Sequence, residues 1–112
     1  EQITNDHSLV AEMVKAGQIT EEEARVHPQR NCITRAVGTD RNVVSDGLIV
    51  RVKENDTIVM CSDGLNTMLE NREILDIAGN RSLAIEERVN MLIDTANNNG
   101  GKDNISAVVI DI

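Results

Sequence analysis

The sequence contains no phenylalanine, tyrosine or tryptophan. Its hydrophobic core must therefore be built from Ile, Leu, Val, Met and Ala, which bury less area per side chain than aromatic rings do. Two cysteines, Cys32 and Cys61, are too few for a disulfide framework, so a reducing, cytoplasmic compartment is expected. The length of 112 residues fits one domain. Its small size and its lack of aromatic side chains predict modest stability.

The chain is not basic, and it has no long apolar run. The formal net charge is −8, which argues against nucleic-acid partners and anionic membranes, because both attract basic surfaces. No apolar run approaches the roughly 20 residues of a membrane-spanning helix, and no signal peptide is visible. The acidity favours solubility, and some carboxylates are candidates for holding cations. Because the chain starts at Glu1 without an initiator methionine, we expect it to be a piece of a longer protein.

Capping residues predict two short helices near the N-terminus. The segment around Ser8 offers helix-capping side chains, and the apolar residues after it fall on one helical face until Gly17. Thr20 and Glu23 have the spacing of a capping box, and Pro28 ends the second helix. The two helices are expected to form a hairpin with a polar exterior.

Three strands are predicted in the middle of the chain. The first is a short strand over 33–37, and a polar loop over 38–46 follows it. Over 48–53, Leu48, Val50 and Val52 alternate with Ile49, Arg51 and Lys53, which predicts a half-exposed strand. The apolar run 57–61 is rich in β-branched residues and predicts a strand buried on both faces. A turn over 54–56 would join the last two strands into a β-hairpin.

Two further helices and a final strand complete the predicted elements. Helical periodicity that stops at Gly79 predicts the first helix, and Ser82 is expected to cap the second. The second helix presents one apolar face, which comprises Ile85, Val89, Leu92, Ile93 and Ala96. Residues 105–112 are strongly strand-like. The order of elements predicts an α+β fold rather than a parallel doubly wound sheet.

Two aspartates occupy positions suited to binding a cation. Asp63 follows the apolar run and precedes Gly64, which lets the backbone bend sharply, and Asp103 precedes the final strand. If the two strands are neighbours, both carboxylates project from one end of the sheet, and hard divalent cations prefer such oxygen ligands. Asp-Gly and Lys-Asp-Asn are ordinary turn sequences, so the spacing alone favours the turn interpretation over a metal site.

Three stretches of sequence resemble the type 2C (metal-dependent, PPM) serine/threonine protein phosphatase family, in the family's order and with bacterial members most similar. They are residues 4–10 with 17–24 and 27–31, residues 56–65 (DTIVMCSDGL) and residues 100–106 (GGKDNIS). The resemblance covers essentially the whole chain, 1–112, as the C-terminal half of that catalytic domain. It implies half of an α-β-β-α sandwich, with a flap-like helical segment over 8–31 and the metal aspartates carried by residues 46–112.

The resemblance also implies a chemistry. Asp63 and Asp103 match family aspartates that bind two Mn²⁺ or Mg²⁺ ions, and many bacterial members hold a third, weaker ion. The family hydrolyses phosphoserine and phosphothreonine in proteins with a metal-activated water. Arg30 and Arg35 are candidates for contacting a phosphorylated substrate near the flap, and surface or salt-bridge roles for both stay open.

Four other reactive side chains have simpler interpretations. His7 is expected at a helix start and His27 at a helix end, each with a structural role. Cys61 has apolar neighbours, which do not lower the pKa of a thiol, so a nucleophilic role is not expected. Lys102 is interpreted as a solvated loop residue.

The family's N-terminal motifs are absent from the chain. By the resemblance, those motifs supply the aspartate that bridges both metals, a backbone carbonyl ligand and a phosphate-binding arginine. We therefore expect the parent protein to be a protein-serine/threonine phosphatase and the isolated chain to have little or no activity. An alternative stays open, which is a non-catalytic regulatory or interaction module that self-associates through an exposed sheet edge.

Overall fold

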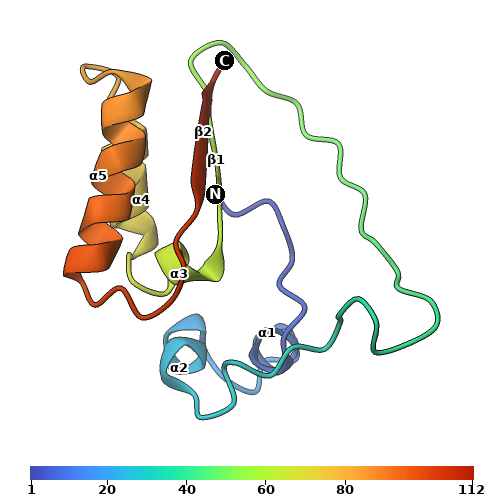
Figure 1. Cartoon of the computed structure of the whole chain (residues 1–112). Coiled ribbons are helices and arrows are strands. Elements are labelled where there is room, and N and C mark those ends of the chain that lie inside the picture. Colours follow the sequence, from blue (N-terminus) through green and yellow to red (C-terminus); the bar gives the residue numbers. More distant parts are fainter. The chain divides into compact units, whose positions relative to one another are not determined.

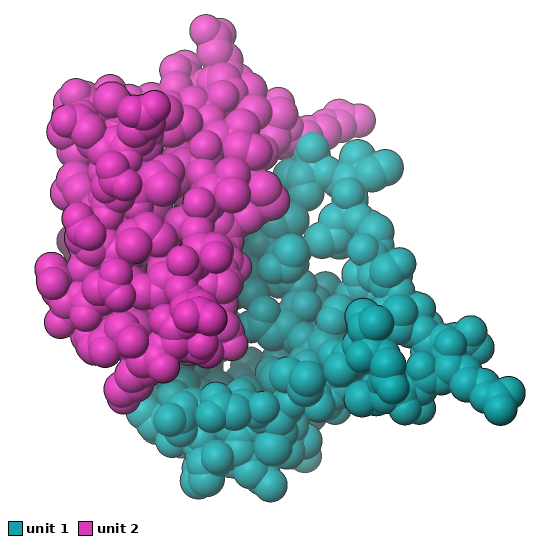
Figure 2. Space-filling view, viewed as in Figure 1, with its two compact units in different colours: residues 1–50 teal, residues 51–112 magenta.

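The computed structural model describes residues 1–112 (Figure 1). The chain divides into two compact units, Glu1–Val50 and Arg51–Ile112 (Figure 2). Helices combine with a pair of antiparallel strands, which confirms the predicted α+β class. None of the five helices has the length and apolarity needed to cross a membrane. The hydrophobic core lies in the second unit, whereas Val10 is the only apolar side chain buried in the first.

Helix α1 (Leu9–Lys15) begins and ends where its sequence predicts. The Ala11 amide donates a hydrogen bond to Ser8 Oγ (3.2 Å), which satisfies one of the free amides at the helix start. Gly17 follows the helix with φ +71°, the left-handed conformation that glycine adopts without a steric cost.

Helix α2 (Glu21–Val26) has the predicted capping box. The Glu23 amide donates to Thr20 Oγ1 (3.1 Å), and the Thr20 amide donates to a Glu23 carboxylate oxygen (2.8 Å). His27 is already extended because Pro28 excludes helical geometry from the residue before it.

The predicted strand over 33–37 is wrong. Only isolated bridges form there, between Ser8 and Ile33 and between Val37 and Asp40. Backbone pairing with residues 7–9 is limited to two hydrogen bonds around the Ser8–Ile33 bridge, which is too little to extend a strand over 33–37.

The predicted strand over 48–53 and the β-hairpin that includes it are also wrong. Residues 41–56 are all exposed, and no strand lies before 57. The alternating pattern predicted a strand whose apolar side faces a covering layer, but no element of the chain covers these residues. The turn at 54–56 does form, with Asn55 at φ +74°.

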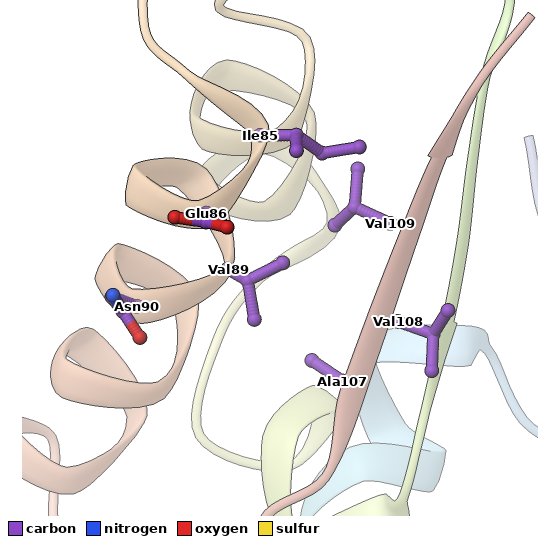
Figure 3. A pocket seen from close by; sticks show the side chains of 7 residues that line it. All are labelled: Ile85, Glu86, Val89, Asn90, Ala107, Val108 and Val109. Atoms are coloured by element: carbon purple, nitrogen blue, oxygen red, sulfur yellow. The ribbon is translucent and has the colours of Figure 1, made fainter.

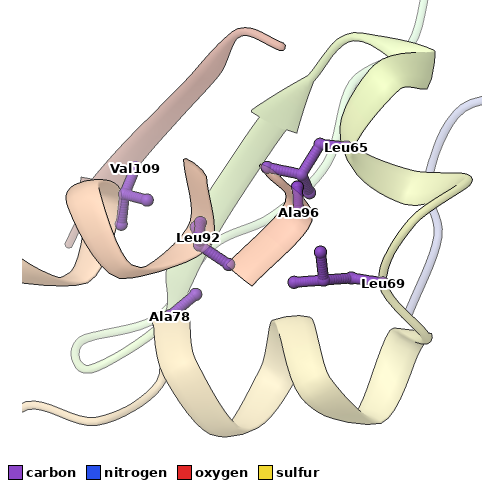
Figure 4. Packing of buried hydrophobic residues seen from close by; sticks show 6 residues of the cluster. All are labelled: Leu65, Leu69, Ala78, Leu92, Ala96 and Val109. Atoms are coloured by element: carbon purple, nitrogen blue, oxygen red, sulfur yellow. The ribbon is translucent and has the colours of Figure 1, made fainter. Parts of the chain in front are cut away.

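The second unit is built around an antiparallel sheet of two strands, β1 (Thr57–Cys61) and β2 (Ala107–Asp111), with Val59 opposite Val109. The remaining elements are the helices α3 (Asp63–Asn66), α4 (Asn71–Ala78) and α5 (Ile85–Asn98). Helix α5 packs against both β2 and α4 (Figure 1). The core between them consists of Leu65, Leu69, Ala78, Leu92, Ala96 and Val109 (Figure 4).

The prediction that β1 is buried on both faces is wrong. Its Cys61 is exposed, and Met60 keeps 53% of its surface exposed. Residues directly opposite each other in an antiparallel pair share a face, so Met60 lies with Val108, and Ile58 lies with Ile110. The helices pack on the other face, which leaves these four apolar residues without a covering layer.

Ser82 does not cap α5, contrary to its prediction. The N-cap is Ala84, whose amide donates to the Glu87 carboxylate (2.9 Å). The Ser82 hydroxyl donates instead to Asn80 Oδ1, so it stabilises the turn before the helix.

Arg88 of α5 is buried, at 2% exposure, and joins three elements. Its guanidinium donates to the Ala78 carbonyl at the end of α4 (2.7 Å) and to both carboxylate oxygens of Asp111 in β2. Hydrogen bonds from Arg88 and then from Thr57 lower the pKa of Asp111 from 3.8 to about 2. These contacts stabilise the ionised carboxylate and hold the end of the sheet against the helices.

Candidate metal centre

Asp63 is the first residue of α3 and is separated from β1 by the single residue Ser62. Its carbonyl accepts hydrogen bonds from the Thr67 amide (3.0 Å) and the Thr67 hydroxyl (2.6 Å), which fixes the backbone at the helix start. Asp63 itself is exposed. A carboxylate in this position is available to a ligand while its backbone is held by the helix.

Asp103 lies in the loop between α5 and β2 and is also exposed. The loop leaves the helix through Gly100 and Gly101, both with positive φ, of +141° and +52°. The Asn104 amide donates to Asp103 Oδ1 (2.7 Å), which fixes the orientation of the carboxylate within the loop.

The two aspartate segments meet at one end of the sheet. Cys61 pairs with Ala107, so the end of β1 adjoins the start of β2. A Cβ atom on Gly64 would lie 2.2 Å from the Asn104 carbonyl oxygen and 3.5 Å from the Asp103 carbonyl carbon. Glycine at position 64 therefore allows an approach of the two backbones that no other residue would permit without a shift.

The donor set suits part of a divalent-metal site. Two exposed carboxylates on adjoining loops offer the oxygen ligands that Mg²⁺ and Mn²⁺ prefer. No group of three or more His, Cys, Asp or Glu side chains is arranged to hold a metal ion. The remaining ligands would have to come from water or from residues outside this chain.

Known proteins similar to this chain are bacterial phosphatases. No family model matches it. The chain is 50% identical over 109 residues to a protein phosphatase of the 2C type from Streptococcus pyogenes, covering 96% of the chain and 44% of the relative. It is 40% identical over 111 residues to protein phosphatase PhpP of Streptococcus pneumoniae, covering 99% of the chain and 45% of that protein.

Solved structures agree with the sequence comparison. Serine/threonine phosphatase Stp1 from Staphylococcus aureus superposes with a TM-score of 0.94 at 41% identity, over 100% of this chain and 44% of that one. The catalytic domain of the phosphatase PstP, solved with two manganese ions, has a TM-score of 0.74 at 32% identity, over 98% of this chain and 44% of the other.

Over nearly its whole length the chain resembles part of type 2C serine/threonine protein phosphatases. It spans less than half the length of the relatives it matches. Its fold is accordingly that of part of a type 2C phosphatase domain.

The two arginines considered for substrate contact differ in their hydrogen-bond partners. Arg35 donates to the Asp46 carboxylate and to the Val44 carbonyl, both at 2.9 Å, so it is engaged within its own segment. Arg30 is exposed and donates to the His27 carbonyl (3.2 Å). Arg30 therefore has more freedom to meet a ligand than Arg35 has.

One long-range contact of this chain has no signal in the sequence. Asp46 accepts hydrogen bonds from Arg35 and pairs with His7 Nε2 (2.8 Å), and these contacts, Arg35 first, lower the pKa of Asp46. His7 does lie at the start of α1, as predicted, but its partner is 39 positions away. No local spacing could have revealed that contact.

The other reactive side chains have the environments that their sequence context indicates. His27 Nδ1 accepts a hydrogen bond from the Gln29 amide (3.1 Å) at the end of α2. Desolvation raises the pKa of the Cys61 thiol, which disfavours the thiolate that a nucleophile needs. Lys102 is an exposed loop residue.

A surface groove of about 500 Å³ lies between α5 and β2 (Figure 3). It is predominantly apolar and lined by Ile85, Glu86, Val89, Asn90, Ala107, Val108 and Val109. Neither Asp63 nor Asp103 contributes to it. The candidate metal centre is therefore the exposed end of the sheet and not the groove.

Proposed function

We propose that this chain is the C-terminal part of the catalytic domain of a bacterial, Mn²⁺- or Mg²⁺-dependent serine/threonine protein phosphatase, and that Asp63 and Asp103 are two of its metal ligands. The observation that carries the proposal is the close approach of the Asp63 and Asp103 segments at one end of the sheet. The names of its relatives support the activity, and the two manganese ions in one structural neighbour support the cofactor.

The chain's own residues contribute ligands and rigidity. Bound divalent ions lower the pKa of water and neutralise charge that develops on a phosphoryl group. Asp63 provides a carboxylate held by the first turn of α3, and Asp103 provides one held by the Asn104 amide. Phosphoserine and phosphothreonine proteins are the proposed substrates, with two ions and in some cases a third at the complete centre.

Residues 8–31 are proposed to act as a flap beside the centre, and residues 46–112 to carry the metal aspartates. Of the two arginines, the exposed Arg30 is better placed than the engaged Arg35 to contact a phosphorylated substrate. We also propose a cytoplasmic location, which the two unpaired cysteines support.

The proposal is tested with the full-length protein that contains this chain. Asp63→Asn and Asp103→Asn should each lower Mn²⁺-dependent hydrolysis of a phosphothreonine peptide by at least about a hundredfold, because each removes a charged metal ligand. Asp94→Asn is the matched control, an exposed carboxylate on α5. Activity that survives both substitutions would overturn the assignment. The isolated 112 residues should show little activity, since two carboxylates do not complete the centre.

A second candidate function is that of a non-catalytic module that pairs with itself or another chain. The uncovered sheet face favours it, because Met60, Val108 and Ile110 expose 53%, 48% and 39% of their surface on one side of two strands. Light scattering after size exclusion distinguishes the two candidates. A dimer that Val108→Lys dissociates, but Leu75→Lys on α4 does not, would support the module.

A further inference from the structure

Ser62 lies between the end of β1 and Asp63, at the point where the loop that carries Asp103 adjoins the sheet. Its backbone amide donates to the Ser106 carbonyl (3.0 Å). Its hydroxyl donates to the Asn104 carbonyl (3.2 Å) and accepts from the Ser106 amide (2.9 Å). A single partly buried hydroxyl thus bonds to two backbone positions of the Asp103 loop.

The Asn104 backbone that Ser62 holds is also the one that determines where Asp103 lies. The Asn104 carbonyl packs directly over Gly64, where a Cβ would meet it at 2.2 Å. The Asn104 amide, on the other side of the same residue, donates to Asp103 Oδ1 (2.7 Å). Moving Asn104 would therefore move the Asp103 carboxylate relative to Asp63.

We propose that Ser62 is a positioning residue for the candidate metal centre. Its hydroxyl holds the 104–106 segment against the start of α3 and thereby fixes how the carboxylates of Asp63 and Asp103 face each other. This inference deepens the proposed function and rests on it. Residues that orient metal ligands through hydrogen bonds change metal affinity without touching the ion.

The test uses the full-length protein that contains this chain, labelled for NMR and titrated with MnCl₂. Paramagnetic broadening of amide signals reports weak Mn²⁺ binding and its location without any catalytic turnover. In the unmodified protein, the amides around Asp63 and around Asp103 should broaden at the same Mn²⁺ concentration, because they share one ion. Ser62→Ala should raise that concentration by about tenfold and separate the two responses. The Ser106 amide should also lose protection from hydrogen exchange.

Two further variants keep the outcome specific. Ser62→Thr retains a hydroxyl at the same position and should restore both the Mn²⁺ affinity and the shared response. Ser106→Ala is the matched control, because the Ser106 contacts to Ser62 use only its backbone. It should behave as the unmodified protein does.

The outcomes separate this inference from the proposed function. If Mn²⁺ broadens neither loop of the unmodified full-length protein at millimolar concentration, or broadens both loops at an unchanged concentration in Asp63→Asn, the proposed metal centre is overturned, and the inference with it. If the unmodified protein responds and Asp63→Asn does not, while Ser62→Ala keeps the original midpoint, the positioning role alone is overturned. A folded Ser62→Thr that binds as poorly as Ser62→Ala would also contradict it.

Discussion

At the scale of single residues, two polar groups occupy opposite ends of the β1–β2 sheet. Ser62, Asp63 and Asp103 gather where β1 ends, and all three remain accessible or partly accessible. At the other end, Arg88 is buried and bound to Asp111. The difference in burial separates an end suited to binding ligands from an end that holds the fold together.

Asp111 gives this chain a specific response to acid. Its pKa falls from 3.8 to about 2 on folding, so its ionised form stabilises the native state above about pH 4 and loses that effect as pH falls towards 2. Asp111→Asn should therefore lower the melting temperature at pH 7, and the deficit should shrink between pH 4 and pH 2. Thermal melts by circular dichroism measure both. A deficit that stays constant down to pH 2 would show that the carboxylate charge is not what stabilises the fold.

At the scale of elements, local signals predicted helices better than strands. The Thr20 capping box and the apolar face of α5 depend on residues a few positions apart, and the structure confirms both. The strand pairing was wrong because β1 bonds to β2, about fifty positions away, and not to the adjacent segment 48–53.

The candidate metal centre was predictable only in outline. The resemblance supplied Asp63 and Asp103, and Gly64 marked a backbone bend. The Ser62 hydrogen bonds and the His7–Asp46 pair join residues that are about forty positions apart, so they needed coordinates.

Helix α5 carries the largest share of the core and provides a prediction at this scale. Leu92 is fully buried between the sheet and α4, whereas its neighbour Met91 keeps 42% of its surface exposed. Leu92→Ala should cost about 2–5 kcal/mol in free energy of unfolding, because it removes buried apolar atoms and leaves a cavity that the neighbouring side chains refill only in part. Met91→Ala should cost less than about 1 kcal/mol, since an exposed side chain leaves no cavity. Urea unfolding curves measure the difference, and equal losses would contradict the assigned core.

At the scale of the whole molecule, order is unevenly distributed along the chain. Residues 51–112 contain six of the seven buried apolar side chains, and residues 41–56 are exposed throughout. A segment that is neither packed nor paired unfolds locally at almost no cost in free energy. Core helices unfold only when much of the fold unfolds with them, so their local unfolding costs far more.

Limited trypsin digestion should detect this unevenness. Proteases bind extended, accessible backbone, so the first cuts near the centre of the chain should follow Arg41, Arg51 or Lys53. They should leave a resistant fragment that ends at Ile112 and retains α4 and α5, because Arg88 is buried and bonded to Asp111. Mass spectrometry of a time course identifies the fragments. Arg51→Gln combined with Lys53→Gln should move the cut to Arg41 without weakening the fragment. Early cleavage after Arg88 would instead mean that the second unit is no more stable than the segment before it.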